Sequence, residues 1–375
     1  MARKISSPTL VEASGTGRKR IEEFVGLVNT GSPTLSIARM HSGEGWSEPG
    51  QRPDFDEYTL VPEPRDRGPI QVSYRLDELA PYIDWTRFFL ARGLKGHYPG
   101  ILDDRIEGSM AERLLDEARA LLRRAQADGL LAVKAVCGFF PASSEGDDIL
   151  LWADEGRESL RARVPCLRQA SVEGARGLCI ADWLAPTGSG LHDWIGAYAV
   201  TAGLGLDASV TAMAARNDGY DATMLALLAD RIAQAAAEKM HEDARKTWWG
   251  YAPGESLPSY SLFRRGYRGM RASPGKAPCP DPRERRLIFQ ILEGPRRTGM
   301  RLDEACALIP SASACGWYFS HPEAAPFAVG RIGREEASRY AIRRGESLEE
   351  TEGWLRNELG YTPPSTAAAD HKEGA

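Results

Sequence analysis

The chain has 375 residues, of which 42% are hydrophobic and 26% charged, and its formal net charge is −5. This composition is typical of globular proteins and excludes a largely disordered chain, while the length allows one large domain or two. The weakly acidic balance offers no broad basic field, which argues against nucleic acid or an anionic membrane as the main partner. The opening MARKISSPTL lacks an apolar signal core and no run of about 18 apolar residues occurs, so we expect a cytoplasmic protein.

The first part of the chain, residues 1–64, has a pattern of its own. The run SPTLSIARMHSGEGWSEPGQRPDFDEYTLV alternates apolar and polar positions around Gly/Pro turns, as short antiparallel strands do. It resembles the opening of a small cupin, but it ends before the strands that would close a barrel. Cupins hold metal with paired histidines, and His41 has no such partner, so we expect no metal site. The open edges leave three possibilities: pairing with the main domain, pairing with another copy, or loose order.

The Pro-rich run PEPRDRGP, residues 62–69, predicts a boundary, and a main domain is expected over residues 65–364. From residue 70 the pattern predicts a strand, followed by a helix that begins near Asp77 and ends at Gly93. The spacing of apolar residues in 109–131 predicts an amphipathic helix with a capping box that starts at Ser109.

The middle of the chain predicts several strands and one long helix. LAVKAVCGFFPA, DDILLWAD and GLCIADWLAP each have the composition of a strand, and residues 193–206 predict a strand that leads into a tight turn. The glycines of this last strand lack the third glycine of a dinucleotide-binding loop, so a phosphate site is not favoured. Residues 220–250 predict the central helix. Because His241 and Glu242 form no HExxH motif, they are expected to be a surface pair.

The C-terminal third predicts a mixture of short elements. Residues 283–294 form a helical pattern, and GWYFSHPEAAPFAVGRIG, residues 316–333, is expected to be a strand–turn–strand hairpin. Residues 335–361 predict two amphipathic helices whose acidic first turns suit the helix dipole. The polar tail 365–375 is expected to be disordered. The six cysteines show no CxxC spacing in a chain that is too large to need disulfides, so free thiols are expected.

Two runs carry the candidate chemistry. YRGMRASPGKAPCPD, residues 267–281, contains two glycines and three prolines, so it must form a shaped loop. Arginine in such a loop offers a planar set of donors that matches a carboxylate or a phosphate. ACGWYFSHPE, residues 314–323, contains an aromatic triplet that can pack in a core or stack on a flat ligand. By residue type alone, a plain surface loop and a half-buried strand are the more common interpretations.

The motifs RASPG (271–275), PCPD (278–281) and GWYFSHP (316–322) resemble the S-adenosylmethionine-binding signatures of the activation domain of cobalamin-dependent methionine synthase. Further similar runs follow in the same order as in that family: ELAPYIDWTRFF, LKGHYPGILDD, GFFPASSEGDDI, IGAYAVTAGLG and KTWWGYAP. The resemblance covers about residues 69–364. It implies an α/β (α+β) fold with a central, twisted, largely antiparallel sheet, helices on its faces and a concave ligand-binding surface.

The resemblance also implies six contacts with S-adenosylmethionine, made by Asp84, Arg271, Ser273, Gly275, Tyr318 and Phe319. Arg271 would bind the carboxylate of the ligand and Asp84 a positively charged part. The backbone of the loop would meet polar edges, and the two aromatic residues would form a wall for the adenosine or the methylthio end. No catalytic residue and no metal ligand is expected.

Two positions depart from the family pattern. Gln234 stands where some members carry an acidic residue, with Glu238 one turn further on. Lys276 replaces the tyrosine of the family loop Arg-x-x-x-Gly-Tyr. The loss of an aromatic wall and a cation near a sulfonium predict weaker affinity for S-adenosylmethionine.

The function that the resemblance implies is reductive methylation of inactive cob(II)alamin to methylcobalamin. S-adenosylmethionine would supply the methyl group, and flavodoxin or a similar reductase the electron. None of the six histidines lies in the Asp-x-His-x-x-Gly motif of cobalamin-binding domains. The cobalamin is therefore expected on a separate methionine synthase subunit, on which this chain would act in trans. The alternative is an S-adenosylmethionine-binding module or a chimeric remnant without catalytic duty.

Overall fold

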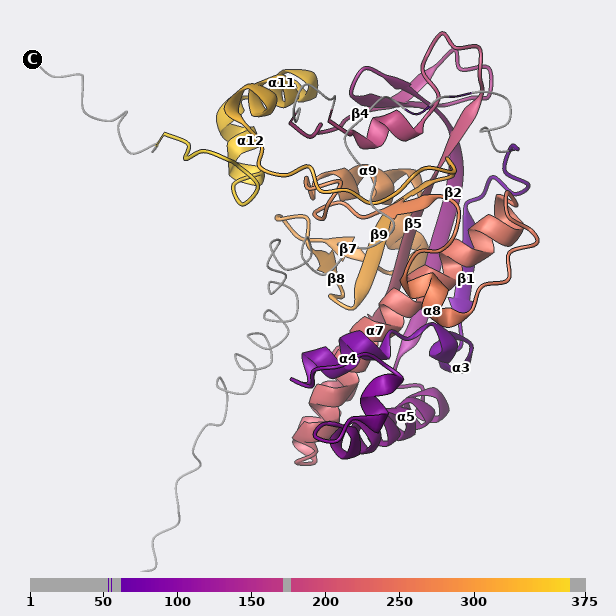
Figure 1. Ribbon diagram of the computed structural model, residues 1–375, viewed down its shortest axis with the longest axis vertical. Helices are drawn as coiled ribbons and strands as arrows, with labels where there is room; N and C mark the ends of the chain where they lie inside the picture. Colours follow the sequence, from indigo (N-terminus) through magenta and orange to yellow (C-terminus); the bar gives the residue numbers. More distant parts are fainter. Residues whose placement is uncertain (1–52, 54, 56–61, 171–176, 365–375) are drawn as a thin grey trace, which may run out of the picture.

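The computed structural model describes residues 53, 55, 62–170 and 177–364. Nearly all of the expected cupin-like fragment, residues 1–64, and the whole tail 365–375 lie outside the described residues. The fold below is therefore that of the main domain (Figure 1).

The centre of the domain is a seven-stranded sheet. Its strands run in the order β4-β3-β2-β5-β9-β6, with β1 also paired to β2, and every pairing between these strands is antiparallel. The strands are β1 (Ile70–Tyr74), β2 (Ala132–Glu145), β3 (Asp148–Trp152), β4 (Leu160–Pro165), β5 (Asp193–Leu204), β6 (Met270–Ala272) and β9 (Ser313–Phe319). A separate two-stranded sheet joins β7 (Arg301–Leu302) and β8 (Leu308–Ile309). The prediction of a largely antiparallel sheet is confirmed.

Two hydrophobic cores cover the two faces of this sheet. Because successive side chains of a strand point to opposite faces, neighbours on β9 enter different cores: Tyr318 joins the first and Phe319 the second. The same alternation holds on β5, where Tyr198 lies in the first core and Ala199 in the second. The sheet is thus the middle of three layers, as expected when both faces of its central strands are buried.

Helices cover the first face. They are α3 (Leu76–Leu79), α4 (Trp85–Ala91), α5 (Gly108–Asp128), α6 (Leu206–Ala215) and α7 (Gly219–Asp243), with the short turns η1 (Ala80–Tyr82) and η2 (Gly100–Asp103). The long α7 runs beside the sheet, with α4 and α5 next to it in Figure 1. It ends in a π-helical turn, η4 (Ala244–Trp248). The prediction of a long central helix is confirmed.

The second face is covered by shorter helices. These are α9 (Glu284–Ile291), α10 (Gly294–Thr298), α11 (Arg334–Arg344) and α12 (Leu348–Trp354), with the 3-10 turn η3 (Ile180–Trp183). The remaining short helix is α8 (Ser259–Phe263). The two C-terminal amphipathic helices predicted from the sequence are present as α11 and α12, which lie side by side in Figure 1.

Several local predictions were wrong for identifiable reasons. The helix expected from Asp77 to Gly93 is divided into α3, η1 and α4, because Pro81 lies in η1 and Asp84 starts a new helix as its N-cap. No capping box starts at Ser109, which lies inside the first turn of α5. Instead, the carboxylate of Asp104 accepts hydrogen bonds from the N–H groups just before that helix, at 2.8 and 2.9 Å.

Two strand predictions also differ from the structure. GLCIADWLAP contains the turn η3, in which the Asp182 carboxylate accepts a hydrogen bond from the Cys179 N–H at 2.9 Å. The second strand of the expected hairpin is absent, since the described residues 321–332 contain no strand. The edge strand β4 was not predicted, although Leu160, Ala162 and Val164 alternate with two arginines as in a half-exposed strand.

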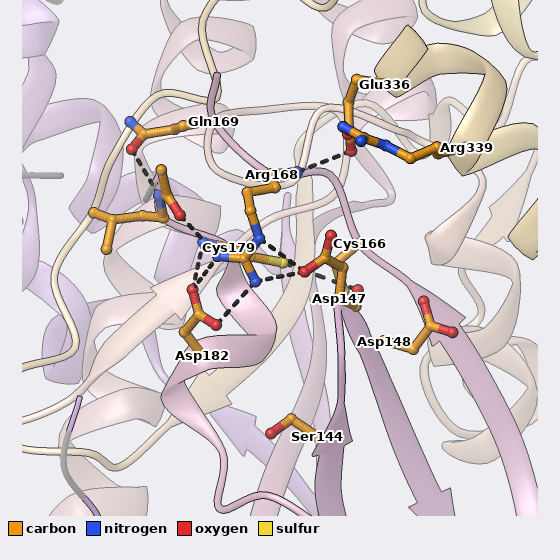
Figure 2. A network of polar contacts seen from close by, with 12 residues as sticks. Ser144, Asp147, Asp148, Cys166, Arg168, Gln169, Cys179, Asp182, Glu336 and Arg339 are labelled. Atoms are coloured by element: carbon orange, nitrogen blue, oxygen red, sulfur yellow. Dashed lines mark hydrogen bonds and ion pairs between the residues drawn. The ribbon is translucent and has the colours of Figure 1, made fainter. Parts of the chain in front are cut away.

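A buried charged network holds the end of the sheet around η3 (Figure 2). The Arg168 guanidinium contacts Asp147 in the turn between β2 and β3 at 2.5 Å, and Asp182 in η3 at 2.6 Å. The hydrogen bonds to both carboxylates are charge-assisted, and the Asp182 side chain is only 3% exposed. The network therefore fixes η3 against the β2–β3 turn.

Candidate functional site

The candidate site lies on the first face of the sheet, where β5, β9 and β6 are neighbours. Arg271 is opposite Tyr318 in the register of β6 and β9, so both side chains point toward the same face. Arg271 was expected in a loop, but it belongs to the three-residue edge strand β6, and the loop follows it. A short strand positions the guanidinium more rigidly than a loop would.

Glycines make room for large rings on this face. Gly196 of β5 is opposite Tyr318, and Gly316 of β9 is opposite Tyr198. A Cβ atom on Gly196 would lie 2.9 Å from the Cβ of Tyr318, and one on Gly316 would lie 3.0 Å from the ring of Tyr198. The two glycine-rich strand motifs of the sequence are thus explained by the packing of two tyrosine rings over a backbone without side chains.

Three aromatic rings are stacked on this floor. The rings of Tyr198 and Tyr318 are parallel within 7° at a centroid distance of 4.6 Å. His241 of α7 stacks on Tyr318 at 4.7 Å and 12°, and the ring of Tyr267 meets His241 edge-on at 4.9 Å. The hydroxyl groups of Tyr198 and Ser273 are hydrogen-bonded at 3.2 Å. The stack therefore connects the last turn of α7 to the loop after β6.

Arg271 is held by an ion pair inside this cluster. Its Nη2 atom donates to Oε2 of Glu238 at 2.5 Å, and the two side chains are 19% and 8% exposed. Burial by itself lowers the pKa of Arg271, but the negative charge of Glu238 and nearby tyrosines outweigh it, so the pKa is raised. The guanidinium is therefore always charged.

His241 is fully buried, so the expectation that it belongs to a surface pair is wrong. Its helical neighbour Glu242 does make an ordinary pair, with Lys246 at 3.2 Å. Burial, together with three nearby arginines, lowers the pKa of His241 well below its usual value. These arginines are Arg245, Arg271 and Arg265. The imidazole is therefore uncharged at neutral pH.

The cluster contains several buried polar atoms that have no hydrogen-bond partner within the part of the chain that the structure describes. They are Nδ1 and Nε2 of His241, Oε1 of Glu238, Nε of Arg271, Nη1 of Arg245 and the hydroxyl of Tyr318. Buried polar groups are normally paired, because burying one unpaired lowers stability. Ordered water or a bound polar group can pair such atoms, so this cluster is the candidate site.

The structure brings some of the expected site residues together and separates one. Arg271, Ser273 and Tyr318 belong to one connected cluster through Tyr198. Phe319, by contrast, packs in the core on the opposite face of the sheet, because adjacent strand residues alternate. Phe319 therefore does not share a wall with Tyr318.

The loop after β6 is closed by its own backbone. The N–H of Gly275 donates to the carbonyl of Cys279 at 2.8 Å, and the N–H of Lys276 donates to the carbonyl of Ser273 at 3.1 Å. Arg285 also donates to the carbonyl of Pro274, at 2.7 Å. These backbone groups are already used within the fold. Gly275 has φ +84°, and a Cβ there would lie 2.6 Å from Nη2 of Arg285, so glycine is required.

Asp84 and the two residues that depart from the family pattern, Lys276 and Gln234, are each at least partly exposed. The Asp84 carboxylate caps α4 by accepting from the N–H of Arg87 at 3.1 Å, and one third of its side chain is exposed. Lys276 is exposed and Gln234 is half-buried on α7. Asp84 thus has the local capping role that its sequence context suggests, while leaving surface that faces solvent.

The sequence interpretation missed the roles of Glu238 and His241. A signal was present: both lie among the buried alanines of α7, such as Ala237, where a charged or polar residue is exceptional. Their partners could not be read from the sequence, since those partners belong to β6 and β9, far along the chain.

Other kinds of site find no support among the described residues. No group of three or more His, Cys, Asp or Glu is arranged to hold a metal ion there. Within the same ranges, no helix combines the length and apolar character that crossing a membrane requires. All six cysteines are buried free thiols.

Together, the fold and the cluster define an α/β domain with a central antiparallel sheet, whose first face contains an ionic and aromatic site. Residues 75–345 match the family model described as the activation domain of vitamin B12-dependent methionine synthase, and the chain belongs to this family. A similar solved structure is the reactivation domain of MetH bound to AdoHcy, with 42% sequence identity and a TM-score of 0.79. That similarity covers 82% of this chain and 96% of the other chain.

Proposed function

We propose that this domain binds S-adenosylmethionine at the cluster around Arg271 and supports the reductive methylation of cob(II)alamin. The observation that carries the proposal is the buried Arg271–Glu238 pair with unpaired donors and acceptors around it, in a chain of the activation-domain family. The similar MetH reactivation domain was solved with AdoHcy, the demethylated form of the same compound. When bound, S-adenosylmethionine would supply the methyl group.

The residues present fit an amino-acid nucleoside. Nε of Arg271 is buried and unpaired among the described residues, so the guanidinium can still donate to a carboxylate while Nη2 remains bonded to Glu238. Ser273 and Gly275 lie at the partly exposed end of the cluster, where the loop could meet the sugar or base. Asp84 retains exposed carboxylate surface that can attract a positively charged part of the ligand.

The aromatic part of the proposed site differs from the sequence expectation at both aromatic residues. Tyr318 is fully buried and its ring is stacked on both Tyr198 and His241, so it would support the floor of the site rather than offer a free ring face to the ligand. Phe319 supports β9 from the opposite core instead. The chain's own contribution is therefore positioning: it orients the ligand and excludes water from the charged end.

We further propose that the domain acts in trans on a cobalamin-binding methionine synthase subunit, with flavodoxin or a similar reductase as the electron donor. The family supports this assignment, since its members are named as the activation part of a vitamin B12-dependent enzyme. Cobalamin would be carried by the partner, and the described residues of this chain contribute the surface on which S-adenosylmethionine is presented.

The binding proposal is tested by calorimetric titration of the full chain with S-adenosylmethionine. The native protein should bind, and Arg271→Lys should bind about tenfold to a hundredfold more weakly, because lysine keeps the charge but loses the planar pair of donors. Arg123→Lys, an exposed position on α5, is the matched control and should bind like the native protein. Equal affinity in the native protein and Arg271→Lys would contradict the assignment of Arg271.

The role in trans is tested separately with a cobalamin-loaded methionine synthase subunit that lacks its own activation domain. The subunit in its cob(II)alamin form is mixed with this protein, S-adenosylmethionine and a reductant. We expect the absorption spectrum to change to that of methylcobalamin. Binding of S-adenosylmethionine without this conversion would leave the binding function intact and refute the role in trans.

A further inference from the structure

Arg285 of α9 is a charged residue that the proposed function does not yet use. Its Nε and Nη2 atoms both donate to the carbonyl of Pro274, at 3.1 and 2.7 Å. Its Nη1 atom donates to the carbonyl of Cys306 at 2.7 Å. Three donors of one guanidinium are thus bound to two main-chain oxygens in other segments of the chain, one of which belongs to the loop after β6.

Pro274 is the second residue of a four-residue turn in this loop. The N–H of Lys276 donates to the carbonyl of Ser273 at 3.1 Å, and Gly275 has φ +84°. A bond from the fourth residue to the first, proline at the second position and a positive φ at the third are the features of a type II β-turn. Type I and type II turns differ in the direction of the peptide group between the second and third residues. In this turn that group is the Pro274–Gly275 peptide, whose carbonyl oxygen is the one that Arg285 holds.

The direction of this peptide decides which backbone surface the turn presents. Pro274 is buried, whereas Gly275 and Lys276 are exposed, and glycine lets a ligand come close to the backbone. A Cβ atom on Gly275 would lie 2.6 Å from Nη2 of Arg285, so the guanidinium lies directly against the turn. If the central peptide turned over, the N–H of Gly275 would leave the carbonyl of Cys279, to which it donates at 2.8 Å.

The guanidinium that holds the turn is itself fixed in place. α9 packs in the second core through Ile288 and Phe289. Cys306 is fully buried in the connection between β7 and β8, where its N–H donates to the carbonyl of Asp303 at 3.1 Å. A planar set of donors between two fixed carbonyls restricts the turn more strictly than one hydrogen bond would.

We propose that Arg285 is a positioning residue of the ligand site: it holds the Pro274–Gly275 peptide in the type II orientation. The backbone at Ser273 and Gly275 is thereby kept in the form that receives the nucleoside end of the ligand. This inference rests on the proposed function, because it concerns the loop of the same site. It assigns a role to a side chain that acts on the ligand only through the turn.

The test compares two thioethers that share the nucleoside. S-adenosylhomocysteine carries an amino-acid end, whereas 5′-methylthioadenosine lacks it. Both are titrated by calorimetry into the full-length native protein and into Arg285→Met, which keeps an unbranched side chain but has no donor. The variant should bind both compounds about tenfold more weakly, because the loop contacts are made with the part that the compounds share.

Arg286→Met is the matched control on the same helix. Arg286 is exposed and donates to the carbonyl of Glu304 at 3.4 Å. Its replacement removes the same charge from α9 without touching the turn. Arg286→Met should therefore bind both compounds like the native protein, and a loss as large as that of Arg285→Met would contradict a specific role of the Pro274 contact.

A double substitution separates positioning from general destabilisation. Gly275→Ala disfavours the positive φ of the turn directly and should also weaken the binding of both compounds. Because both substitutions act on the same peptide, the double variant Gly275→Ala/Arg285→Met should lose less affinity than the product of the two single losses. Losses that multiply in full would contradict the inference, since they would show that the two residues act independently.

The remaining outcomes are also decisive. Native affinity of Arg285→Met for both compounds would overturn the inference, and so would a loss confined to S-adenosylhomocysteine, since Arg285 would then act at the amino-acid end. If the native protein binds neither compound, the proposed function fails and this inference fails with it. If Arg285→Met does not fold, Arg285→Lys is the second variant. It should bind both compounds about threefold or more weakly, because an ammonium lacks the planar set of donors, and native affinity would overturn the inference.

Discussion

Replacing Glu284 by glutamine should stabilise the protein at alkaline pH. Glu284 begins α9, is only 6% exposed, and its Oε2 accepts a hydrogen bond from Nε1 of Trp317 at 3.0 Å. Burial raises the pKa of this carboxyl from 4.5 to about 7. Glutamine keeps an acceptor for the tryptophan but cannot ionise.

The sign and size of the effect follow from linkage. A pKa that is higher in the folded state means that the folded protein holds the proton more tightly than the unfolded chain. The corresponding stability is complete below pH 4.5 and is lost as the pH rises through about 7. The rise of the Glu284 pKa from 4.5 to about 7 corresponds to about 3 kcal/mol of unfolding free energy. Because glutamine cannot ionise, the Glu284→Gln variant should not lose this unfolding free energy as the pH rises.

The native protein and Glu284→Gln are denatured with urea at about pH 5 and about pH 8.5, and unfolding is monitored by tryptophan fluorescence. The difference in unfolding free energy between the two proteins should shift by about 3 kcal/mol in favour of the variant at the higher pH. Glu335→Gln, whose side chain is 86% exposed, is the control and should show no such shift. If the difference in unfolding free energy between Glu284→Gln and the native protein is the same at both pH values, the raised pKa of Glu284 is refuted.

Three further predictions concern the floor of the site, the charged network and the loop. Gly316→Ala should lower the free energy of unfolding by about 1–3 kcal/mol, because its Cβ would overlap a backbone carbonyl of β6. Gly219→Ala is the control and should be neutral, because nothing lies within 4 Å of the added Cβ. Urea denaturation compares the two variants. Arg168→Met should destabilise the protein by about 3 kcal/mol in the same assay, because it takes the guanidinium away from the buried Asp182 carboxylate, and an unchanged midpoint would contradict this. Lys276→Tyr should bind S-adenosylmethionine more tightly than the native protein does, since it removes a cation and adds an aromatic wall; equal affinities by calorimetry would count against a role for Lys276.

The sequence predicted the elements whose patterns are local. The strands β2, β3, β5 and β9 contain nearly continuous apolar runs, and the long helix α7 is rich in buried apolar residues. The division of the helix before Gly93 was also encoded locally, by Pro81 and by the capping residue Asp84, but the apolar spacing across them outweighed these signals in the prediction.

The candidate site was only partly predictable, because it depends on pairing between distant segments. The motifs around Arg271 and Tyr318 identified two strands of the site, but their register, which puts these two residues opposite each other, is a tertiary property. Adjacent residues of a strand point to opposite faces, so Tyr318 and Phe319 cannot line the same face of the sheet. The prediction of a single aromatic wall did not take this alternation into account. His241 was judged from the absence of a metal motif, although its position on the alanine-rich face of α7 marked it as buried.

The most direct test of the central claim is a crystal structure of the full-length protein in complex with S-adenosylmethionine. The account predicts that the ligand carboxylate lies within hydrogen-bonding distance, about 3 Å, of the Arg271 guanidinium, on the face of the sheet that carries Tyr318. A ligand bound on the opposite face, or one whose carboxylate contacts other residues while Arg271 remains paired with Glu238 alone, would contradict it.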